Sequence, residues 1–254
     1  MHIYVLLVIA STAKQSKNRN SLSRRTITAT ILILLTIPLT IFFGIQFLDD
    51  RRFLFISILI IFQTMLPFAL VFEGRKPQAR EVVVIAVLIS IAVAGRGAFF
   101  MLPQFKPIIA LIIISGVSFG AESGFLVGAM SMFVSNMFFG QGPWTPWQMF
   151  AAGIIGFLAG ILFRKGLLSH SPVLLAVFGG LSTFFVYGGI MSTASAIIWQ
   201  PNPTREMILT AIFYGLPFNL VLAVATVLFI FLFAKPMLEK LDRIKMKYGL
   251  VEHF

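Results

Sequence analysis

Hydrophobic residues in this chain gather into long continuous runs that are separated by short polar segments. A helix needs about 20 apolar residues to cross a bilayer core, and backbone polar groups in lipid must find their partners within the segment. The runs are continuous rather than alternating, which favours helices over the strands of a membrane barrel. The pattern predicts an all-α, polytopic membrane helix bundle with hydrophobic helices at about residues 27–48, 53–72, 81–101, 108–119, 124–139, 148–163, 172–198 and 207–234.

Three features modify this simple pattern. The run at residues 108–119 is short for a membrane span, so we expect it to be tilted, broken or partly re-entrant. Pro38 is expected to kink the first run, because proline removes a helical hydrogen bond. The last run leads into a basic amphipathic segment, Lys235 to Tyr248.

Composition agrees with a membrane location, since 58% of the residues are hydrophobic and the mean hydropathy is +0.96. The chain has 20 Lys and Arg residues against 9 Asp and Glu residues, and the basic residues are divided unequally between the two sides of the predicted membrane. Lys and Arg resist translocation, so the richer side is predicted to be cytoplasmic, with both termini on it. The richer side holds Lys14, Lys17, Arg19, Arg24, Arg25, Arg75, Lys76, Arg80, Arg164, Lys165, Lys235, Lys240, Arg243, Lys245 and Lys247, and the remaining basic residues are Arg51, Arg52, Arg96, Lys106 and Arg205.

A basic, proline-containing segment at residues 74–80 is interpreted as a soft boundary. It separates an N-terminal extension, residues 1–80 with two predicted transmembrane helices, from a six-helix core at residues 81–240, which a basic cytoplasmic tail at residues 241–254 follows. The chain has no cysteine, which excludes disulfides, cysteine-bound zinc and a thiol nucleophile. Because the basic residues are spread over short loops and tails, we expect no nucleic-acid partner.

Small residues recur every four positions in the third run, at Ala86, Ser90, Ala94 and Ala98. Side chains four apart share one face of a helix, and a stripe of small residues lets a second helix approach closely in lipid. Two interpretations remain open. The stripe serves packing inside the bundle, or it is a docking face for a separate subunit.

The predicted outer loops are rich in tryptophan, proline and side-chain amides. Residues 140–147 contain Gln141, Trp144 and Trp147, and Trp199 begins a second loop of similar composition. Tryptophan at a membrane surface is often an anchor. Aromatic walls with a few amides also suit a pocket for a bulky organic ligand, and the further amides are Gln148, Gln200 and Asn202.

Polar side chains within the predicted spans support the same interpretation, a ligand pocket. Asn136, Tyr187, Tyr214 and Asn219 are expected to face the bundle interior or a cavity, although an interhelical hydrogen bond explains each of them equally well. Arg96 either reaches the outer interface with its charged end or binds an anionic part of a ligand.

Signals for catalysis are weak. Residues 116–120 fit the pattern G-x-S-x-G around Ser118, but that turn follows a strand in hydrolases and here it ends a hydrophobic run. No base is predicted near Ser118, and Glu122 is expected in an inner turn; the histidines are His2, His170 and His253. A phosphate-binding loop and a carboxylate array within the spans are both missing from the sequence, so we expect neither ATP hydrolysis nor ion coupling by this chain. We therefore expect no catalytic residue, no metal site and no cofactor.

From Glu81 to about residue 240 the chain resembles the substrate-binding S component of energy-coupling factor (ECF) transporters, bacterial importers of vitamins and related micronutrients. The resemblance rests on six spans with both ends inside, the stripe Ala86, Ser90 and Ala94, the segment FGAESGFLVGAMSMFVSNMFFGQGPWTPWQM, and the following GIIGFLAGILF. Residues 1–80 depart from the six-span pattern.

This resemblance implies a mechanism and partners. An S component of this family captures its ligand from outside, docks on a transmembrane T component that two ATPase subunits drive, and topples in the bacterial cell membrane. Ala86 and Ser90 would meet the coupling helices of the T component, with Ser90 in place of the more usual alanine. The ligand pocket would be closed by the loops at 97–107, 140–147 and 199–204.

The sequence thus favours a high-affinity vitamin-capture subunit over two alternatives. These are an intramembrane serine hydrolase that uses Ser118 or Glu122, and an assembly factor that binds partner helices without a small ligand. The predicted outer loops are lined by aromatic and amide side chains with few fixed charges, which favours a bulky, largely neutral ligand. Cobalamin or another corrinoid is the first choice, and riboflavin, queuosine-type bases and other vitamins remain open. The predicted substrate-binding residues are Arg96, Asn136, Gln141, Trp144, Trp147, Tyr187, Trp199 and Asn219.

Overall fold

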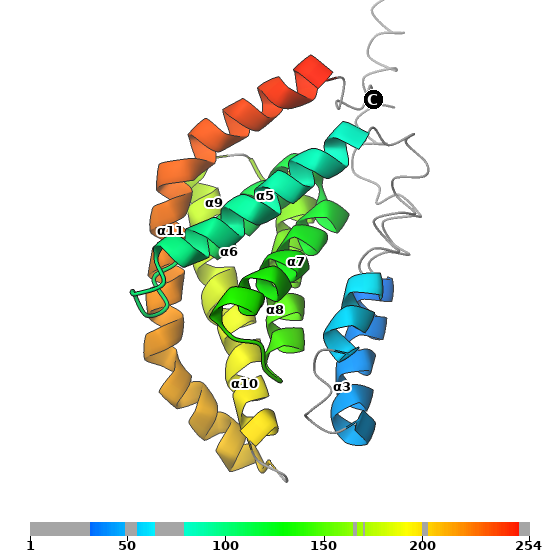
Figure 1. Cartoon of the computed structure of the whole chain (residues 1–254). Coiled ribbons are helices and arrows are strands. Elements are labelled where there is room, and N and C mark those ends of the chain that lie inside the picture. The colour runs from blue at the N-terminus through cyan, green and yellow to red at the C-terminus, as the bar shows by residue number, and fades with distance from the viewer. Residues whose placement is uncertain are drawn as a thin grey trace, which may run out of the picture.

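The computed structural model describes residues 31–48, 55–63, 79–164, 167–169, 171–199 and 203–248. These residues are almost entirely helical, and no strand occurs among them, which confirms the all-α fold (Figure 1). Residues 55–63 form one helical segment. The other elements are η1 (Leu32–Thr36), α3 (Ile37–Leu48), α5 (Ala79–Ala98), α6 (Ile108–Phe119), α7 (Ala121–Phe139), α8 (Thr145–Ala159), η3 (Gly160–Arg164), α9 (Pro172–Leu181), η4 (Ser182–Tyr187), α10 (Gly188–Trp199) and α11 (Arg205–Tyr248), in which η marks a π-helical turn.

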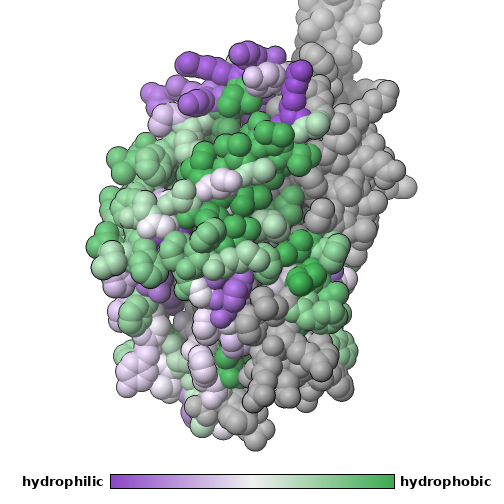
Figure 2. Space-filling view, viewed as in Figure 1, coloured by the Kyte–Doolittle hydropathy of each residue, from purple (hydrophilic) through white to green (hydrophobic). Residues whose placement is uncertain are grey.

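Four continuous helices among the described residues are long and apolar enough to cross a membrane. They are α5, α8 with η3, α9 through α10, and α11. A belt of hydrophobic side chains crosses the visible face, and hydrophilic side chains gather at the end where α11 finishes (Figure 2). The membrane location expected from the hydrophobic runs is thereby supported. The orientation of the termini and the boundaries at residues 80 and 240 stay predictions.

The short helix α6 is the centre of the bundle. All twelve of its residues are buried, and it contacts α5, α7, α8, α9 and α11. A helix that is apolar on every side is stable when other helices surround it. Its short length is therefore explained by its central position, since a backbone inside the protein need not reach both membrane surfaces.

Helices α6, α7 and α8 approach each other closely where glycines face glycines. A Cβ atom on Gly156 of α8 would collide with the carbonyl oxygen of Gly124 on α7, and one on Gly116 of α6 would collide with the carbonyl oxygen of Gly156. Contacts of this kind are typical of membrane helices, where close packing replaces the hydrophobic effect.

Gly156→Ala is expected to destabilise the bundle by about 1–3 kcal/mol, because the added methyl group must displace the backbone of α7. Gly189→Ala is the matched control, since a Cβ atom at Gly189 in α10 meets nothing within 4 Å. That variant is expected to keep or slightly raise stability, by up to about 1 kcal/mol. Thermal unfolding in detergent measures both, and equal midpoints for the two variants would contradict the close crossing.

The longest helix, α11, has 44 residues and continues through Pro217 and Pro236. Its last turns fold against the start of α5 and the α6–α7 turn. The Lys245 Nζ atom lies 5.5 Å from the centre of the Phe119 ring, and the Arg80 guanidinium lies 5.3 Å from the centre of the Tyr248 ring. We call this end of the molecule the basic end, and we call the opposite end, where α10 ends and α11 begins, the loop end (Figure 1).

The described part of the N-terminal extension is a pair of helical segments, residues 31–48 and 55–63, that lies beside α8 (Figure 1). Gln63 Nε2 donates a hydrogen bond to Thr40 Oγ1 at 2.6 Å, and the π-helical turn η1 ends just before Pro38. The predicted runs at 27–48 and 53–72 are therefore helical over their described residues.

Candidate functional site

Arg96 lies in the last turn of α5 and joins this helix to α7. Its Nη1 atom donates hydrogen bonds to Ser135 Oγ at 2.5 Å and to Asn136 Oδ1 at 2.7 Å. The guanidinium also lies 5.6 Å from the centre of the Phe139 ring, which is a cation–π distance. A cation at this position is favoured by the negative end of the helix dipole.

Asn136 is the centre of the polar cluster, since its side chain joins three helices. Its Oδ1 atom accepts from Arg96, and its Nδ2 atom donates to Thr145 Oγ1 at 3.0 Å and to Gln148 Oε1 at 2.8 Å. The Asn136 side chain is buried, so all of its strong hydrogen-bonding groups must be satisfied inside the protein. This requirement fixes the position of each partner.

Gln141 and Tyr187 extend the cluster on either side. Thr145 Oγ1 donates to Gln141 Oε1 at 2.8 Å, and Gln141 Nε2 donates to the Phe133 carbonyl at 3.0 Å. The Tyr187 side chain shares a hydrogen bond with Gln148 and interacts electrostatically with Arg96. We call this set the Arg96 network; its members are Arg96, Ser135, Asn136, Gln141, Thr145, Gln148 and Tyr187.

Arg96 has N–H groups that the hydrogen bonds among the described residues do not use. A guanidinium carries five N–H groups, and both hydrogen bonds of Arg96 to other side chains come from Nη1, so Nε and Nη2 have no hydrogen-bond partner among the described residues. In that part of the chain no carboxylate pairs with Arg96 either. The site therefore suits a ligand that presents oxygen or nitrogen acceptors.

Lys106 adds a second positive charge near the site. Burial lowers the pKa of the Lys106 ammonium from its usual value, and the charge of Arg96 lowers this pKa further. The two cations repel each other, and a bound ligand with electron-rich acceptor atoms would stabilise both charges.

Phenylalanines form the aromatic surface beside Arg96. Phe100 and Phe139 stack with their ring centres 5.0 Å apart, and Phe99 contacts both Phe105 and Phe229. The sequence pointed to the tryptophans instead, because in a chain with 28 phenylalanines no local pattern distinguishes the few that lie beside Arg96.

The three tryptophans differ in their surroundings. The Trp144 ring lies directly against Gly142, so a larger side chain at that position would have to displace the ring, and Trp147 packs partly buried against the core. Trp199 is 66% exposed at the end of α10. Trp144 and Trp147 flank Thr145 along the chain and are half-buried, Trp199 is on the surface, and Gln200 and Asn202 lie outside the described residues.

Asn219 belongs to a different contact. Its Nδ2 atom donates to Ser192 Oγ at 3.3 Å, and its side chain fills the space beside Gly188. This bond joins α10 to α11 and is the interhelical alternative that the sequence left open. Tyr214 is 72% exposed.

The small-residue stripe lies on the outer surface of α5. Ala86, Ser90 and Ala94 are exposed, whereas Ile85, Leu88 and Ala92 form the buried face of the same helix. The Ser90 hydroxyl donates to the Ala86 carbonyl at 2.9 Å and is thereby satisfied within its own helix. No described helix covers the stripe, so internal packing among the described residues does not account for it.

Ser118 and Glu122, the residues of the hydrolase alternative, are both buried near the basic end. Ser118 Oγ and Glu122 Oε1 have no hydrogen-bond partner within the described residues. His170, the histidine nearest in sequence, lies outside the described residues.

Comparisons with known proteins identify the family. The chain matches the family model described as ECF-type riboflavin transporter, S component, over residues 76–235. A UPF0397 protein of Aliivibrio fischeri strain MJ11 is 32% identical over 126 residues, which is 43% of this chain and 67% of the relative. A UPF0397 protein of Vibrio atlanticus is 35% identical over 88 residues, 33% of this chain and 48% of the relative.

No solved structure matches the chain significantly. The family model nevertheless extends from before α5 into α11 and includes the whole Arg96 network. This match covers more than half of the chain and confirms the resemblance seen in the sequence. The protein therefore belongs to the family of ECF-type riboflavin transporter S components.

Proposed function

We propose that this chain is the vitamin-capture subunit of an ATP-driven importer and that it binds its ligand at the Arg96 network. The observation that carries the proposal is the set of unused N–H donors on Arg96, held by Asn136 and Ser135 beside an aromatic surface. Binding sites for small molecules combine apolar walls with a few well-placed polar groups. Family membership supports a transporter subunit as the host of such a site.

We infer that the ligand is riboflavin or a closely related planar vitamin. The isoalloxazine ring of riboflavin is planar and neutral, and its carbonyl oxygens and ring nitrogens are acceptors. An arginine fork can donate two parallel hydrogen bonds to such an edge, and aromatic side chains stack on such a ring. Cobalamin, the first choice from the sequence, has no support in the comparisons, whereas the family description names riboflavin.

Purified protein is expected to quench riboflavin fluorescence on binding, and an excess of cobalamin is expected not to displace the flavin. Competition with riboflavin analogues that lack one ring carbonyl tests the hydrogen bonds, since each lost acceptor leaves an Arg96 donor unpaired. A corrinoid that co-purifies with the protein and competes with riboflavin would contradict the inferred ligand.

The same proposal places the basic end in the cytoplasm, with both termini there, and the loop end outside. The excess of Lys and Arg at the basic end supports this orientation. The exposed stripe Ala86, Ser90 and Ala94 begins two turns from the basic end of α5 and is offered as the surface that docks on the T component. Two ATPase subunits would then supply the energy, since no phosphate-binding loop occurs in the sequence.

A further inference from the structure

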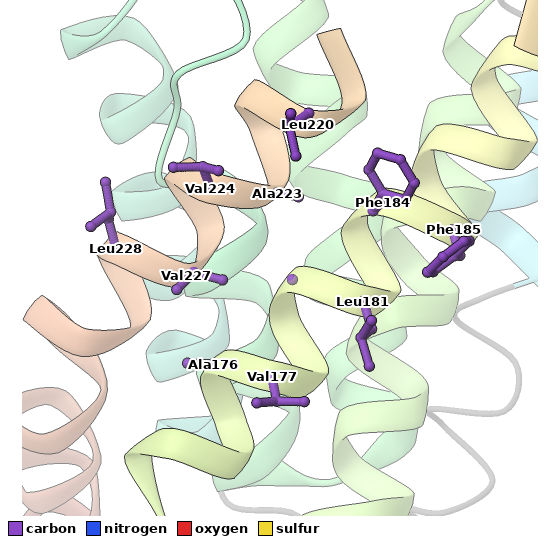
Figure 3. Close-up of a pocket in the computed structure, with 11 residues that line it drawn as sticks. Ala176, Val177, Leu181, Phe184, Phe185, Leu220, Ala223, Val224, Val227 and Leu228 are labelled. Carbon is purple, nitrogen blue, oxygen red and sulfur yellow. The ribbon is translucent and has the colours of Figure 1, made fainter. Parts of the chain in front are cut away.

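An apolar groove runs along the contact between α11 and the segments α9 and η4, on a different part of the bundle from the Arg96 network. Its volume is about 420 Å³. In Figure 3 two neighbouring helices present rows of hydrocarbon side chains along it. The lining residues are Ala176, Val177, Gly180, Leu181, Phe184, Phe185, Leu220, Ala223, Val224, Val227 and Leu228.

The groove lies in the half of the hydrophobic bundle nearer the basic end. Its two walls, residues 176–185 and 220–228, are each about 15 Å long at 1.5 Å per residue, which is about half of a 30 Å hydrocarbon core. The wall on α9 starts one turn after Pro172, the first residue of that helix at the basic end. The groove therefore faces the acyl chains of the leaflet at the basic end.

The shape of the groove suits a flexible chain better than a helix. Its floor is made of small residues, and a Cβ atom on Gly180 would already lie 2.9 Å from Val227 Cγ2. Its rims carry large exposed side chains, with Leu181 at 55% and Phe185 at 66% exposure. Surfaces that receive a helix in lipid keep small residues along the whole stripe, as α5 does.

A positive charge stands at the basic end of the groove. Lys235 is exposed and follows Leu228 by seven residues and Val224 by eleven, so all three share one face of α11. It lies about 10 Å beyond Leu228 along the helix, at the depth where lipid headgroups begin. Glu239 follows on the same face one turn further away from the groove.

We propose that this groove binds one acyl chain of an anionic phospholipid from the leaflet at the basic end, with Lys235 pairing with the headgroup phosphate region. The occupant is identified by the hydrocarbon lining, the single-leaflet length and the charge at one end. The cytoplasmic location of this leaflet rests on the orientation proposed above, but binding of the lipid itself does not depend on it.

The test compares phosphatidylglycerol with phosphatidylcholine on the full chain. Detergent-purified protein is incubated with each lipid and the lipid retained per chain is counted by native mass spectrometry. Val224→Trp, which fills the groove, is expected to lower retention of both lipids, whereas Leu209→Trp on an exposed part of α11 outside the groove is expected to change neither. Lys235→Gln is expected to reduce the preference for phosphatidylglycerol by about five-fold.

Lys240→Gln is the matched charge control, because Lys240 is exposed on the same segment but points about 120° away from Leu228 on the helix. Equal loss of preference in the two lysine variants, or unchanged retention in Val224→Trp, would overturn the proposal. A change from monomer to dimer in wild-type protein that Val224→Trp abolishes, without change in bound lipid, would overturn it in favour of a second copy. Riboflavin titration of the same samples tests the proposed vitamin site independently. A failure of the lipid proposal can therefore be distinguished from a failure of the vitamin site.

Discussion

Ala86→Trp is expected to abolish vitamin uptake by the assembled transporter while vitamin binding to the isolated subunit stays within about two-fold of wild type, as for distant and independent sites. Ala86 is exposed on α5 and lies ten residues before Arg96, about 15 Å away along the helix. A tryptophan there prevents close approach of a partner helix without entering the Arg96 network. Uptake of labelled vitamin into vesicles that contain the T component and the ATPases measures the first effect, and fluorescence titration measures the second.

Leu209→Trp is the control for added bulk on a lipid-facing helix, since Leu209 is 57% exposed on α11. It is expected to support normal uptake. If Ala86→Trp loses binding and uptake together, the stripe supports the bundle itself rather than a partner. If the variant transports normally, the proposed docking face is wrong.

Arg96→Met is expected to raise the dissociation constant for riboflavin on the order of 100-fold. The substitution keeps much of the length of the side chain but removes its donors, and hydrogen bonds to a charged group contribute about 1.5–3 kcal/mol each. Arg96→Lys keeps the charge without the planar fork, so a smaller loss of about ten-fold is expected. Titration of flavin fluorescence in detergent or nanodiscs gives the three constants.

Thr145→Val tests whether riboflavin binding depends on the donors of Arg96 themselves or only on an intact set of hydrogen bonds in the Arg96 network. Thr145 is buried, accepts a hydrogen bond from Asn136 and donates one to Gln141, and it is not among the hydrogen-bond partners of Arg96. The variant is expected to lower thermal stability and to bind riboflavin far better than Arg96→Met. Equal loss of binding in the two variants would show that the donors of Arg96 are not what the ligand recognises.

Most of the helices could be predicted from the sequence because lipid permits few alternatives for a long apolar run. The run at 108–119 coincides with α6, and the run at 172–198 differs from the helical segment Pro172–Trp199 by one residue. Hydropathy alone could not place α6 at the centre, since a buried helix and a lipid-facing helix have the same composition. Its burial depends on glycine contacts between helices, which a single run does not reveal.

The candidate site was partly predictable. Arg96 and Asn136 stood out because polar groups are costly at membrane depth and are usually paired, and the structure does pair them. Ser135 and Thr145 gave no comparable signal, because hydroxyl groups are common in membrane helices and can bond to their own backbone. Asn219 gave the same signal as Asn136 yet bonds to Ser192, since the type of residue does not say which helix faces it.

The unbroken course of α11 has a geometric consequence. Its 44 residues amount to about 66 Å at 1.5 Å per residue, more than the roughly 40–45 Å of a whole bilayer with its headgroups. The helix must therefore lean, bend or protrude, and Figure 1 shows it bowed around the bundle. Because Lys245 and Tyr248 near its far end lie against Phe119 and Arg80, this one helix connects the start of α5 and the α6–α7 turn to the opposite end of the bundle, where Arg205 lies.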